Sequence, residues 1–336
     1  MDIKKNISLQ SFNTFGMNVN AQEFVSIDSL KGLIDVLNTN PSHLFILGGG
    51  SNMLLTKDID ALVLHINLKG ISVISTSNER VKVQVSAGES WHEFVSWCLS
   101  KDFGGLENLS LIPGNVGTAP IQNIGAYGVE LKDRFVSCEA INIQTKELKI
   151  FSKDECEFGY RNSIFKHALK GEYIITSVVF ELSTENHSIK INYGAIESEL
   201  QKNGINNPSI QEVSKAVISI RNTKLPDPKI LGNSGSFFKN PMISYSKFEV
   251  LKSQFPLIPH YKVSEVDVKV PAGWLIETTG FKGKTFGNYG VHNKQALVLV
   301  NYGGASGENI LNLSIQIQKA VKLIFDIDLE SEVNIL

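Results

Sequence analysis

The sequence predicts an α+β protein, because helical and strand-like patterns are mixed along its 336 residues without strict alternation. A doubly wound parallel sheet would instead show strands and helices in regular succession. Hydrophobic residues make up 42% of the chain and charged residues 20%, as in an ordinary globular protein that can bury a large core. A chain of this length is expected to form two or three domains.

Short apolar runs bounded by polar or glycine-rich segments predict the strands. Most of them are rich in Val and Ile, which favour extended backbone on a half-buried surface. The runs are "LFIL" (44–47), "ALVLHI" (61–66), "VKVQVSA" (81–87), "YIITSVVFEL" (173–182) and "ALVLV" (296–300).

Four segments show an apolar stripe with helical spacing, and we interpret each stripe as core packing. Two of them start with a capping-box pattern, Ser90 with Glu93 and Ser209 with Glu212. The second of these helices should end before Pro226. The predicted helices are 28–38 (stripe Leu30, Leu33, Ile34, Leu37), 90–103 (Trp91, Phe94, Val95, Cys98, Leu99), 209–225 and 306–325 (Ile310, Leu313, Ile317, Val321, Ile324).

Charge and hydropathy argue against two classes of partner. The formal net charge is -2, which favours neither nucleic acid nor an anionic membrane. The N-terminal residues "MDIKKNISLQSFNTFGM" contain no apolar run of signal-peptide length. No apolar stretch approaches the eighteen or so residues of a membrane span. We therefore expect a cytoplasmic protein.

The cysteine and histidine patterns argue against a metal site. The three cysteines, Cys98, Cys138 and Cys156, form no C-x-x-C pair and are expected to be buried or idle thiols. The seven histidines are scattered, with no H-x-x-x-H spacing. We expect no zinc centre.

Two glycine-rich stretches are candidates for binding a phosphate-bearing cofactor. In "LFILGGGSN" a strand runs into three glycines, whose exposed N–H groups could form an anion nest. The dinucleotide fingerprint G-x-G-x-x-G does not fit, because Met53 occupies its last glycine position. The segment "GFKGKT" resembles the end of a Walker A motif, but Thr278 stands where the leading glycine should be. Taken alone, the glycine triplet could equally be a turn.

The second stretch is "IPGNVGTAPIQNIGAYG", residues 112–128, with four glycines, two prolines and no charge. So long a segment without helical or strand period usually indicates function or disorder, and disordered segments are richer in charge. It suits a large flat cofactor lying against the main chain, with Thr118, Gln122 and Asn123 as side-chain donors. The alternative is a rigid loop held by its own backbone hydrogen bonds.

Six motifs in order carry a resemblance that covers the whole chain. They are "LGGGSN", "IPGNVGTAPIQNIGAYG", "FGYRNS", "TKLPDP", "GSFFKNP" and "LESEV". The chain resembles the UDP-N-acetylenolpyruvoylglucosamine reductases, also called UDP-N-acetylmuramate dehydrogenases. The resemblance implies a two-part FAD-binding module of the p-cresol methylhydroxylase/vanillyl-alcohol oxidase type and a third, α+β substrate-binding domain.

The resemblance also implies an activity. NADPH reduces a non-covalently bound FAD, which then reduces the enolpyruvyl double bond of UDP-N-acetylglucosamine enolpyruvate, giving UDP-N-acetylmuramate for peptidoglycan synthesis and cell-wall biogenesis. We expect a monomer without nucleic-acid partners.

The glycine- and proline-rich segment 223–236 reads as a linker into the third domain. With the resemblance, the expected divisions are FAD-binding subdomain 1 (1–68), FAD-binding subdomain 2 (69–225) and the substrate-binding domain (226–327). The C-terminal strand 328–336 could return to the first subdomain.

The resemblance assigns functional residues position by position. The cofactor-binding residues are Gly48, Gly49, Gly50, Ser51, Asn52, Ile112, Pro113, Gly114, Gly117, Thr118, Pro120, Gln122, Asn123, Ile124, Gly125, Ala126, Tyr127 and Arg221. The catalytic residues are Arg161, Ser236 and Glu332. The substrate-binding residues are Tyr160, Tyr193, Lys224, Asn240, Lys282 and Gln295. The Tyr193 segment is typical of the longer of the family's two classes. Asn334 departs from that class, which often has Arg there, so a flavin contact is expected to be weaker or replaced.

The residue types suit the implied reaction. Hydride addition to an enolpyruvyl carboxylate builds negative charge, which a preorganised arginine such as Arg161 can bind through two parallel hydrogen bonds. Ser236 could give a proton to the α-carbon, provided the carbanion is strongly basic. Glu332 could orient the substrate or assist the proton transfer.

Two alternatives remain on sequence grounds. One is a flavoenzyme of the same cofactor fold that oxidises a phenol or a sugar alcohol. The other is a non-catalytic protein that binds a UDP-sugar or flavin, which the presence of Arg161, Ser236 and Glu332 disfavours.

Overall fold

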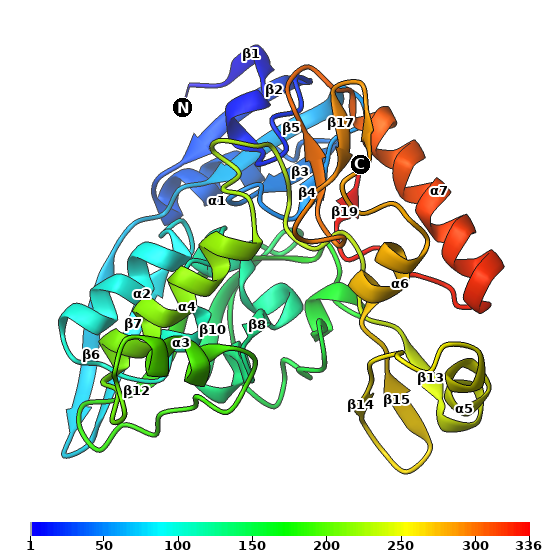
Figure 1. Ribbon diagram of the computed structural model, residues 1–336. Helices are drawn as coiled ribbons and strands as arrows, with labels where there is room; N and C mark the ends of the chain where they lie inside the picture. Colours follow the sequence, from blue (N-terminus) through cyan, green and yellow to red (C-terminus); the bar gives the residue numbers. More distant parts are fainter. Residues whose placement is uncertain (1) are drawn as a thin grey trace. The chain divides into compact units, whose positions relative to one another are not determined.

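The fold is described here from a computed structural model, which describes residues 2–336 (Figure 1). The chain forms two compact units, each built from separate stretches of sequence. Unit 1 comprises residues 1–7, 21–49 and 59–223, and unit 2 comprises residues 8–20, 50–58 and 224–336. No helix among the described residues is long and apolar enough to cross a membrane.

Unit 1 contains two sheets of different kinds. The first has the order β1-β2-β5-β3, and β5 pairs in parallel with both β2 and β3. The second has the order β11-β10-β12-β7-β6, with antiparallel pairing throughout. The strands are β1 (Lys4–Ser8), β2 (Asn20–Ile27), β3 (Leu44–Leu47), β5 (Ile59–Ile66), β6 (Ile71–Ser77), β7 (Arg80–Ser86), β10 (Phe135–Asn142), β11 (Leu148–Ser152) and β12 (Tyr173–Ser183). The hairpin β8 (Gly125–Ala126) and β9 (Val129–Glu130) lies in the second glycine-rich segment and just beyond it.

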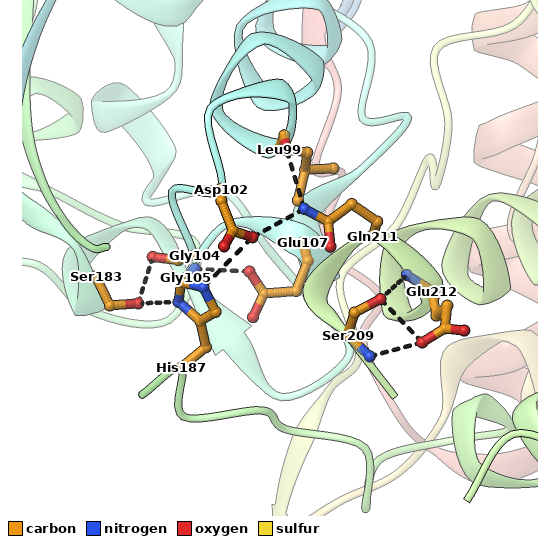
Figure 2. A network of polar contacts seen from close by, with 10 residues as sticks. All are labelled: Leu99, Asp102, Gly104, Gly105, Glu107, Ser183, His187, Ser209, Gln211 and Glu212. Atoms are coloured by element: carbon orange, nitrogen blue, oxygen red, sulfur yellow. Dashed lines mark hydrogen bonds and ion pairs between the residues drawn. The ribbon is translucent and has the colours of Figure 1, made fainter. Parts of the chain in front are cut away.

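Serine side chains cap three of the helices of unit 1, whereas the helix that follows Ala195 has no side-chain cap. The helices of this unit are α1 (Leu30–Asn38), α2 (Trp91–Ser100), α3 (Ile196–Lys202) and α4 (Ile210–Lys224), whose last residue belongs to unit 2. The hydroxyl of Ser29 accepts the N–H of Gly32 to cap α1. At α4, Ser209 and Glu212 form the predicted capping box, in which each residue's side chain accepts the main-chain N–H of the other (Figure 2).

Helices α2 and α4 lie side by side in unit 1 (Figure 1). The Gln211 amide at the start of α4 donates to Leu99 O, in the last turn of α2, and to Asp102 Oδ1, just beyond that helix, at 3.0 Å each (Figure 2). Next to this contact, His187 connects Asp102 to Ser183, the last residue of β12. This polar network holds the two helices in an antiparallel arrangement and fixes the start of α4.

Unit 2 combines small sheets with three helices. Its sheets have the orders β13-β15-β14, β16-β17-β18 and β19-β4, and the last pair is parallel. The strands are β4 (Met53–Leu54), β13 (Met242–Ser244), β14 (Tyr261–Lys262), β15 (Asp267–Lys269), β16 (Thr285–Phe286), β17 (Tyr289–Val291), β18 (Leu299–Asn301) and β19 (Asn334–Ile335). The helices are α5 (Tyr245–Gln254), α6 (Ala272–Thr278) and α7 (Gly307–Phe325).

The predicted α+β class is confirmed, with two corrections inside the predicted stripes. Leu30 is 44% exposed, because it sits at the first position of α1, before the buried face begins with Leu33. Ile324 is 43% exposed, while the next residue, Phe325, is 1% exposed and closes the buried face of α7. Three helices, α3, α5 and α6, were not predicted from the sequence.

The cysteines are buried thiols, as expected from the sequence. All three are free and buried. Cys138 lies within hydrogen-bonding distance of Cys156, and this contact together with burial raises the pKa of the Cys138 thiol. A raised thiol pKa keeps the group protonated and poorly nucleophilic.

Candidate functional site

The two glycine-rich segments touch each other in unit 1. A Cβ added to Gly48 would lie 2.4 Å from Cγ2 of Thr118. A Cβ added to Gly49 would lie 2.7 Å from Oδ1 of Asn115 and 2.9 Å from Cα of Gly114. Glycine at 48 and 49 therefore allows the two loops to pack main chain against main chain.

The second loop is held rigidly by hydrogen bonds. Gly117 N–H donates to Ala87 O at 2.9 Å, and a Cβ at Gly117 would lie 2.4 Å from that of Ala87. Asn123 has φ +44°, and its amide donates to Glu130 Oε2 and to Gly159 O at 3.0 Å each. The sequence left open a cofactor cradle or a rigid loop. The loop is rigid, which also suits a cradle.

Two arginine side chains, Arg161 and Arg221, lie near Tyr127 of this loop. Burial raises the pKa of the Tyr127 hydroxyl, and the nearby Arg221 partly offsets that rise. Burial lowers the pKa of Arg221, Tyr127 opposes this effect, and the like charge of Arg161 adds to it. The Arg161 side chain is also close to Gly125, where an added Cβ would lie 3.4 Å from a guanidinium nitrogen.

Backbone conformation marks the same region. Leu111, Tyr127 and Arg161 have φ values of +59°, +49° and +53°, in the left-handed region that non-glycine residues seldom adopt. Strained backbone of this kind is concentrated at functional sites. Asn108 supports Tyr127 by donating from Nδ2 to its carbonyl at 3.0 Å and to Lys190 O at 2.8 Å.

The residues of this region fit a cofactor rich in hydrogen-bond acceptors. The Nε of Arg221 is buried and has no hydrogen-bond partner among residues 2–336. An unpartnered donor beside an uncharged, glycine-rich loop matches the diphosphate and carbonyl oxygens of FAD. The part of the chain that the structure describes contains no group of His, Cys, Asp or Glu side chains that could hold a metal ion.

Two further predicted residues of unit 1 lie near this cluster. Tyr160 stacks under Arg161, whose guanidinium carbon is 5.7 Å from the ring centroid. Tyr193 is 51% exposed and packs against the loop at Gly128, where an added Cβ would lie 3.3 Å from that of Tyr193. Unit 1 thus brings together Tyr127, Tyr160, Arg161 and Arg221, with Tyr193 at the end of the loop.

In unit 2, the first glycine loop continues against the chain's C-terminal segment. Gly50 has φ +60°, and a Cβ there would lie 1.9 Å from Phe12 O, so only glycine fits. Asn52 donates from Nδ2 to the carbonyl of Glu332 at 3.2 Å, and its own carbonyl accepts from Asn334. These bonds keep the loop and residues 332–334 together.

Ser236 and Glu332 occupy neighbouring segments of unit 2. Ser236 pairs with Val298 in an isolated antiparallel bridge, and Glu332 N–H donates to Phe237 O at 2.8 Å. Both residues are half-buried, so their side chains are within reach of solvent or substrate. These main-chain contacts keep the segments of Ser236 and Glu332 together, although the two residues lie far apart in the sequence.

Of the other predicted substrate residues of unit 2, Asn240 and Gln295 both lie at the start of α6, whereas Lys282 and Lys224 lie elsewhere. Asn240 Oδ1 accepts the N–H of Ala272 at 2.9 Å at the start of α6, and Gln295 Oε1 lies 3.1 Å from where a Cβ on Gly273 would be. Lys282 makes an ion pair with Glu277 at 2.9 Å, away from the start of that helix. Lys224, the last residue of α4, is exposed.

Sequence reasoning missed three further side chains, two in unit 1 and one in unit 2. Asn115 contacts the position of Gly49, and His92 accepts the N–H of Leu111. His292 is 9% exposed, and its Nδ1 has no partner among residues 2–336, while burial and Lys294 lower its pKa. The only sequence signal was the polar residue His92 next to a stripe of core positions.

Family models match both parts of the chain. Residues 23–149 match the model described as "FAD binding domain", and residues 227–336 match "UDP-N-acetylenolpyruvoylglucosamine reductase, C-terminal domain". The FAD-binding match confirms the predicted flavin-binding module, because it covers both glycine-rich loops.

Full-length relatives agree with these models. The UDP-N-acetylenolpyruvoylglucosamine reductase of Flavobacterium johnsoniae is 58% identical over all of both chains. That of Bacteroides fragilis is 43% identical over 99% of this chain and all of the relative. The solved structure of the Thermus caldophilus UDP-N-acetylenolpyruvylglucosamine reductase matches with a TM-score of 0.71 at 22% identity, covering 100% of this chain and 99% of that one, which shows a shared fold.

Proposed function

Because the chain belongs to the UDP-N-acetylenolpyruvoylglucosamine reductase family, we propose that it reduces UDP-N-acetylglucosamine enolpyruvate to UDP-N-acetylmuramate with NADPH as electron donor. The structural observation that carries the proposal is the cluster of Arg161 and Arg221 beside a rigid, uncharged loop. Two like charges this close are costly unless an electron-rich ligand lies near them. A flavin together with a carboxylate substrate supplies such groups.

The flavin is held, in this proposal, by the two glycine-rich loops and Arg221. Gly48 and Gly49 let the first loop pack closely on the second, and Arg221 offers its buried Nε. When bound, FAD accepts electrons from NADPH and supplies the hydride that adds to the β-carbon of the substrate. Neither loop contains His or Cys, so the flavin is proposed to be non-covalent.

Arg161 binds the substrate carboxylate, whose negative charge grows during hydride addition. A guanidinium can form two parallel hydrogen bonds to a carboxylate, and its positive charge stabilises that growth. The strained backbone at Arg161 fixes the direction of its side chain before the substrate arrives. No reorganisation is then needed during the reaction.

Ser236 is proposed to donate the proton that the α-carbon needs after hydride addition. Its place in a main-chain bridge with Val298 fixes the position of Cβ, so the hydroxyl has a defined reach. Glu332 is held beside this segment by its bond to Phe237 O and is proposed to orient the substrate or to assist the proton transfer. A serine hydroxyl is a weak acid, so this role requires a strongly basic carbon.

Substrate binding is assigned, in this proposal, to Tyr160, Tyr193, Lys224, Asn240, Lys282 and Gln295. Of these, Tyr193 and Lys224 are proposed to hold the diphosphate and the base of UDP. The structure refines what two of these side chains can offer. Asn240 Oδ1 already accepts a hydrogen bond from Ala272, which leaves Nδ2 to donate to a ligand. Lys282 already pairs with Glu277, so a diphosphate contact would have to compete with that ion pair.

The proposal is tested by NADPH oxidation with and without the enolpyruvyl sugar. We expect steady turnover only when both are present, with a product heavier than the substrate by two hydrogens. Turnover of a phenol or a sugar alcohol instead would indicate an oxidase of related cofactor fold. Bound flavin without any turnover would indicate a binding protein.

Location and assembly are part of the same proposal. We infer a cytoplasmic protein, since the substrate and NADPH of the proposed reaction are cytoplasmic compounds. We also infer a monomer, because residues from one chain suffice for every role above. Light scattering at working concentration with bound FAD tests the second inference, and a mass of about 37.0 kDa is expected.

A further inference from the structure

The first turn of α2 binds the main chain that enters the second glycine loop. Trp91 donates its main-chain N–H to Gly114 O and its indole Nε1–H to Leu109 O, each at 2.9 Å. The main-chain carbonyl of Glu89, two residues before the helix, accepts the N–H of Val116 at 2.9 Å. The helix start therefore determines the path of residues 109–116.

Among these contacts between the start of α2 and residues 109–116, the hydrogen bond of His92 is the one that depends on the protonation state of a side chain. Its Nδ1 accepts the N–H of Leu111 at 3.0 Å, so the proton of the neutral ring is on Nε2. Leu111 has φ +59°, and it immediately precedes the loop that begins at Ile112. The hydrogen bond thus holds a left-handed residue at the point where the loop starts, which without support would be unfavourable.

The charges that face His92 come from two helices. Glu93 is its neighbour on α2, and Arg221 approaches from α4, which runs antiparallel to α2. Residues 109–116 contain no titratable side chain. Burial lowers the pKa of His92 from its usual 6.5, and Arg221 lowers it further, while Glu93 opposes the shift. The neutral form is therefore the stable one at neutral pH.

We propose that His92 is a positioning residue for the flavin loop, which it holds in its binding geometry through the Leu111 hydrogen bond. The inference rests on the proposed function, because the loop's ligand is taken to be FAD. Protonation at Nδ1 would point an N–H at the N–H of Leu111 and break the bond. The bond is intact above the pKa of His92 in the folded protein and is lost as the pH falls through it.

Two substitutions separate this role from general packing. His92→Leu removes the acceptor but keeps an apolar side chain of similar reach. His92→Asn keeps an acceptor oxygen near the position of Nδ1 and cannot titrate between pH 5 and 8. His43→Asn, on an exposed histidine, is the control. Apoprotein is titrated with FAD by fluorescence quenching from pH 5 to 8, and amide exchange of Leu111 is measured by NMR.

We expect His92→Leu to raise the Kd for FAD roughly threefold to tenfold at pH 7.5, as for one neutral hydrogen bond. Exchange of the Leu111 amide should become faster in the same variant. His92→Asn should bind FAD nearly as well as the unaltered protein at pH 7.5. Below pH 6.5 the unaltered protein and His43→Asn should lose affinity, and His92→Asn should lose less.

Equal weakening by His92→Leu and His92→Asn would overturn the proposal, as would an unchanged acid dependence in His92→Asn. An unchanged Leu111 exchange rate in His92→Leu would do the same. If His92→Leu does not fold, the comparison of His92→Asn with the unaltered protein decides the question. If the protein binds no FAD, the proposed function fails, while amide exchange still reports whether His92 holds Leu111.

Discussion

Asn334 donates both its main-chain N–H and its side-chain amide to the carbonyl oxygen of Asn52, at 3.1 and 2.8 Å. Asn52 in turn donates to the carbonyl of Glu332. The C-terminal strand β19 therefore supports the first glycine loop through a side chain at the position where the resemblance suggested Arg. The side chain of Asn334 thus contacts the main chain of the loop directly.

Asn334→Ala is expected to weaken FAD binding by no more than about tenfold, because one neutral hydrogen bond is lost and the main-chain bond remains. Flavin fluorescence titration measures the effect. Asn288→Ala is a matched control, since Asn288 donates a similar bond to Gly303 O at 3.0 Å elsewhere in unit 2. Equal weakening in both variants would show that Asn334 has no particular role at the loop.

Gly48 and Thr118 provide a second test, based on the contact between the two loops. Gly48→Ala should destabilise the protein by about 1–3 kcal/mol and weaken FAD binding, because the new Cβ would overlap Thr118 Cγ2 at 2.4 Å. Thr118→Ser removes that methyl group and keeps the hydroxyl bond to Asn115 O at 2.8 Å. The double variant should recover most of the loss.

Thermal unfolding and FAD titration of the two single variants and the double variant form a double-mutant cycle. A coupling energy near zero would mean that Gly48 is required for another reason. The most direct alternative is close approach of the flavin itself to the Gly48 main chain.

The glycine triplet 48–50 illustrates how much of the site could be predicted from the sequence. A run of three glycines after a strand correctly indicated a special loop, and the FAD-binding assignment is confirmed. The reason for glycine at 48 and 49 was not predictable, because it lies in the opposing loop, more than sixty residues away in sequence. Contacts between distant segments leave no periodic signal in either segment.

His92 and Asn240 illustrate the same limit for side chains. His92 lies beside the stripe of core residues on α2, and nothing local reveals that it accepts the N–H of Leu111. Asn240 is assigned to the substrate by resemblance, and no local pattern reveals that its oxygen also accepts the first N–H of α6. Local patterns did predict α1, α2, α4 and α7, because a cap such as Ser209 with Glu212 is a short-range interaction.

Lys224→Ala is expected to raise the KM for the enolpyruvyl sugar at least several-fold, if Lys224 contacts the diphosphate. A charge-assisted hydrogen bond contributes about 1.5–3 kcal/mol. Lys229→Ala, five residues further along on an equally exposed lysine, is the control and should leave KM unchanged. Steady-state kinetics at saturating NADPH measure both, and an unchanged KM for Lys224→Ala would remove this residue from the site.

The final prediction separates the two half-reactions through Ser236. Its main chain is paired with Val298 independently of the side chain, so Ser236→Ala should preserve the fold. Stopped-flow flavin absorbance should show reduction by NADPH at nearly the unaltered rate, since no proton is needed from Ser236 at that stage. Reoxidation by the enolpyruvyl sugar should slow by roughly 10²–10⁴-fold, as for loss of a general acid.

Two further variants test the chemistry behind that split. Ser236→Cys keeps a transferable proton and should retain more reoxidation activity than Ser236→Ala. Arg161→Lys should also slow reoxidation, because a point charge cannot form the two parallel hydrogen bonds of a guanidinium. Equal slowing of both half-reactions in Ser236→Ala would assign the residue to binding or folding. If neither half-reaction slows, the proton comes from Glu332 or water, and Ser236 is not the donor even though the enzyme is a reductase.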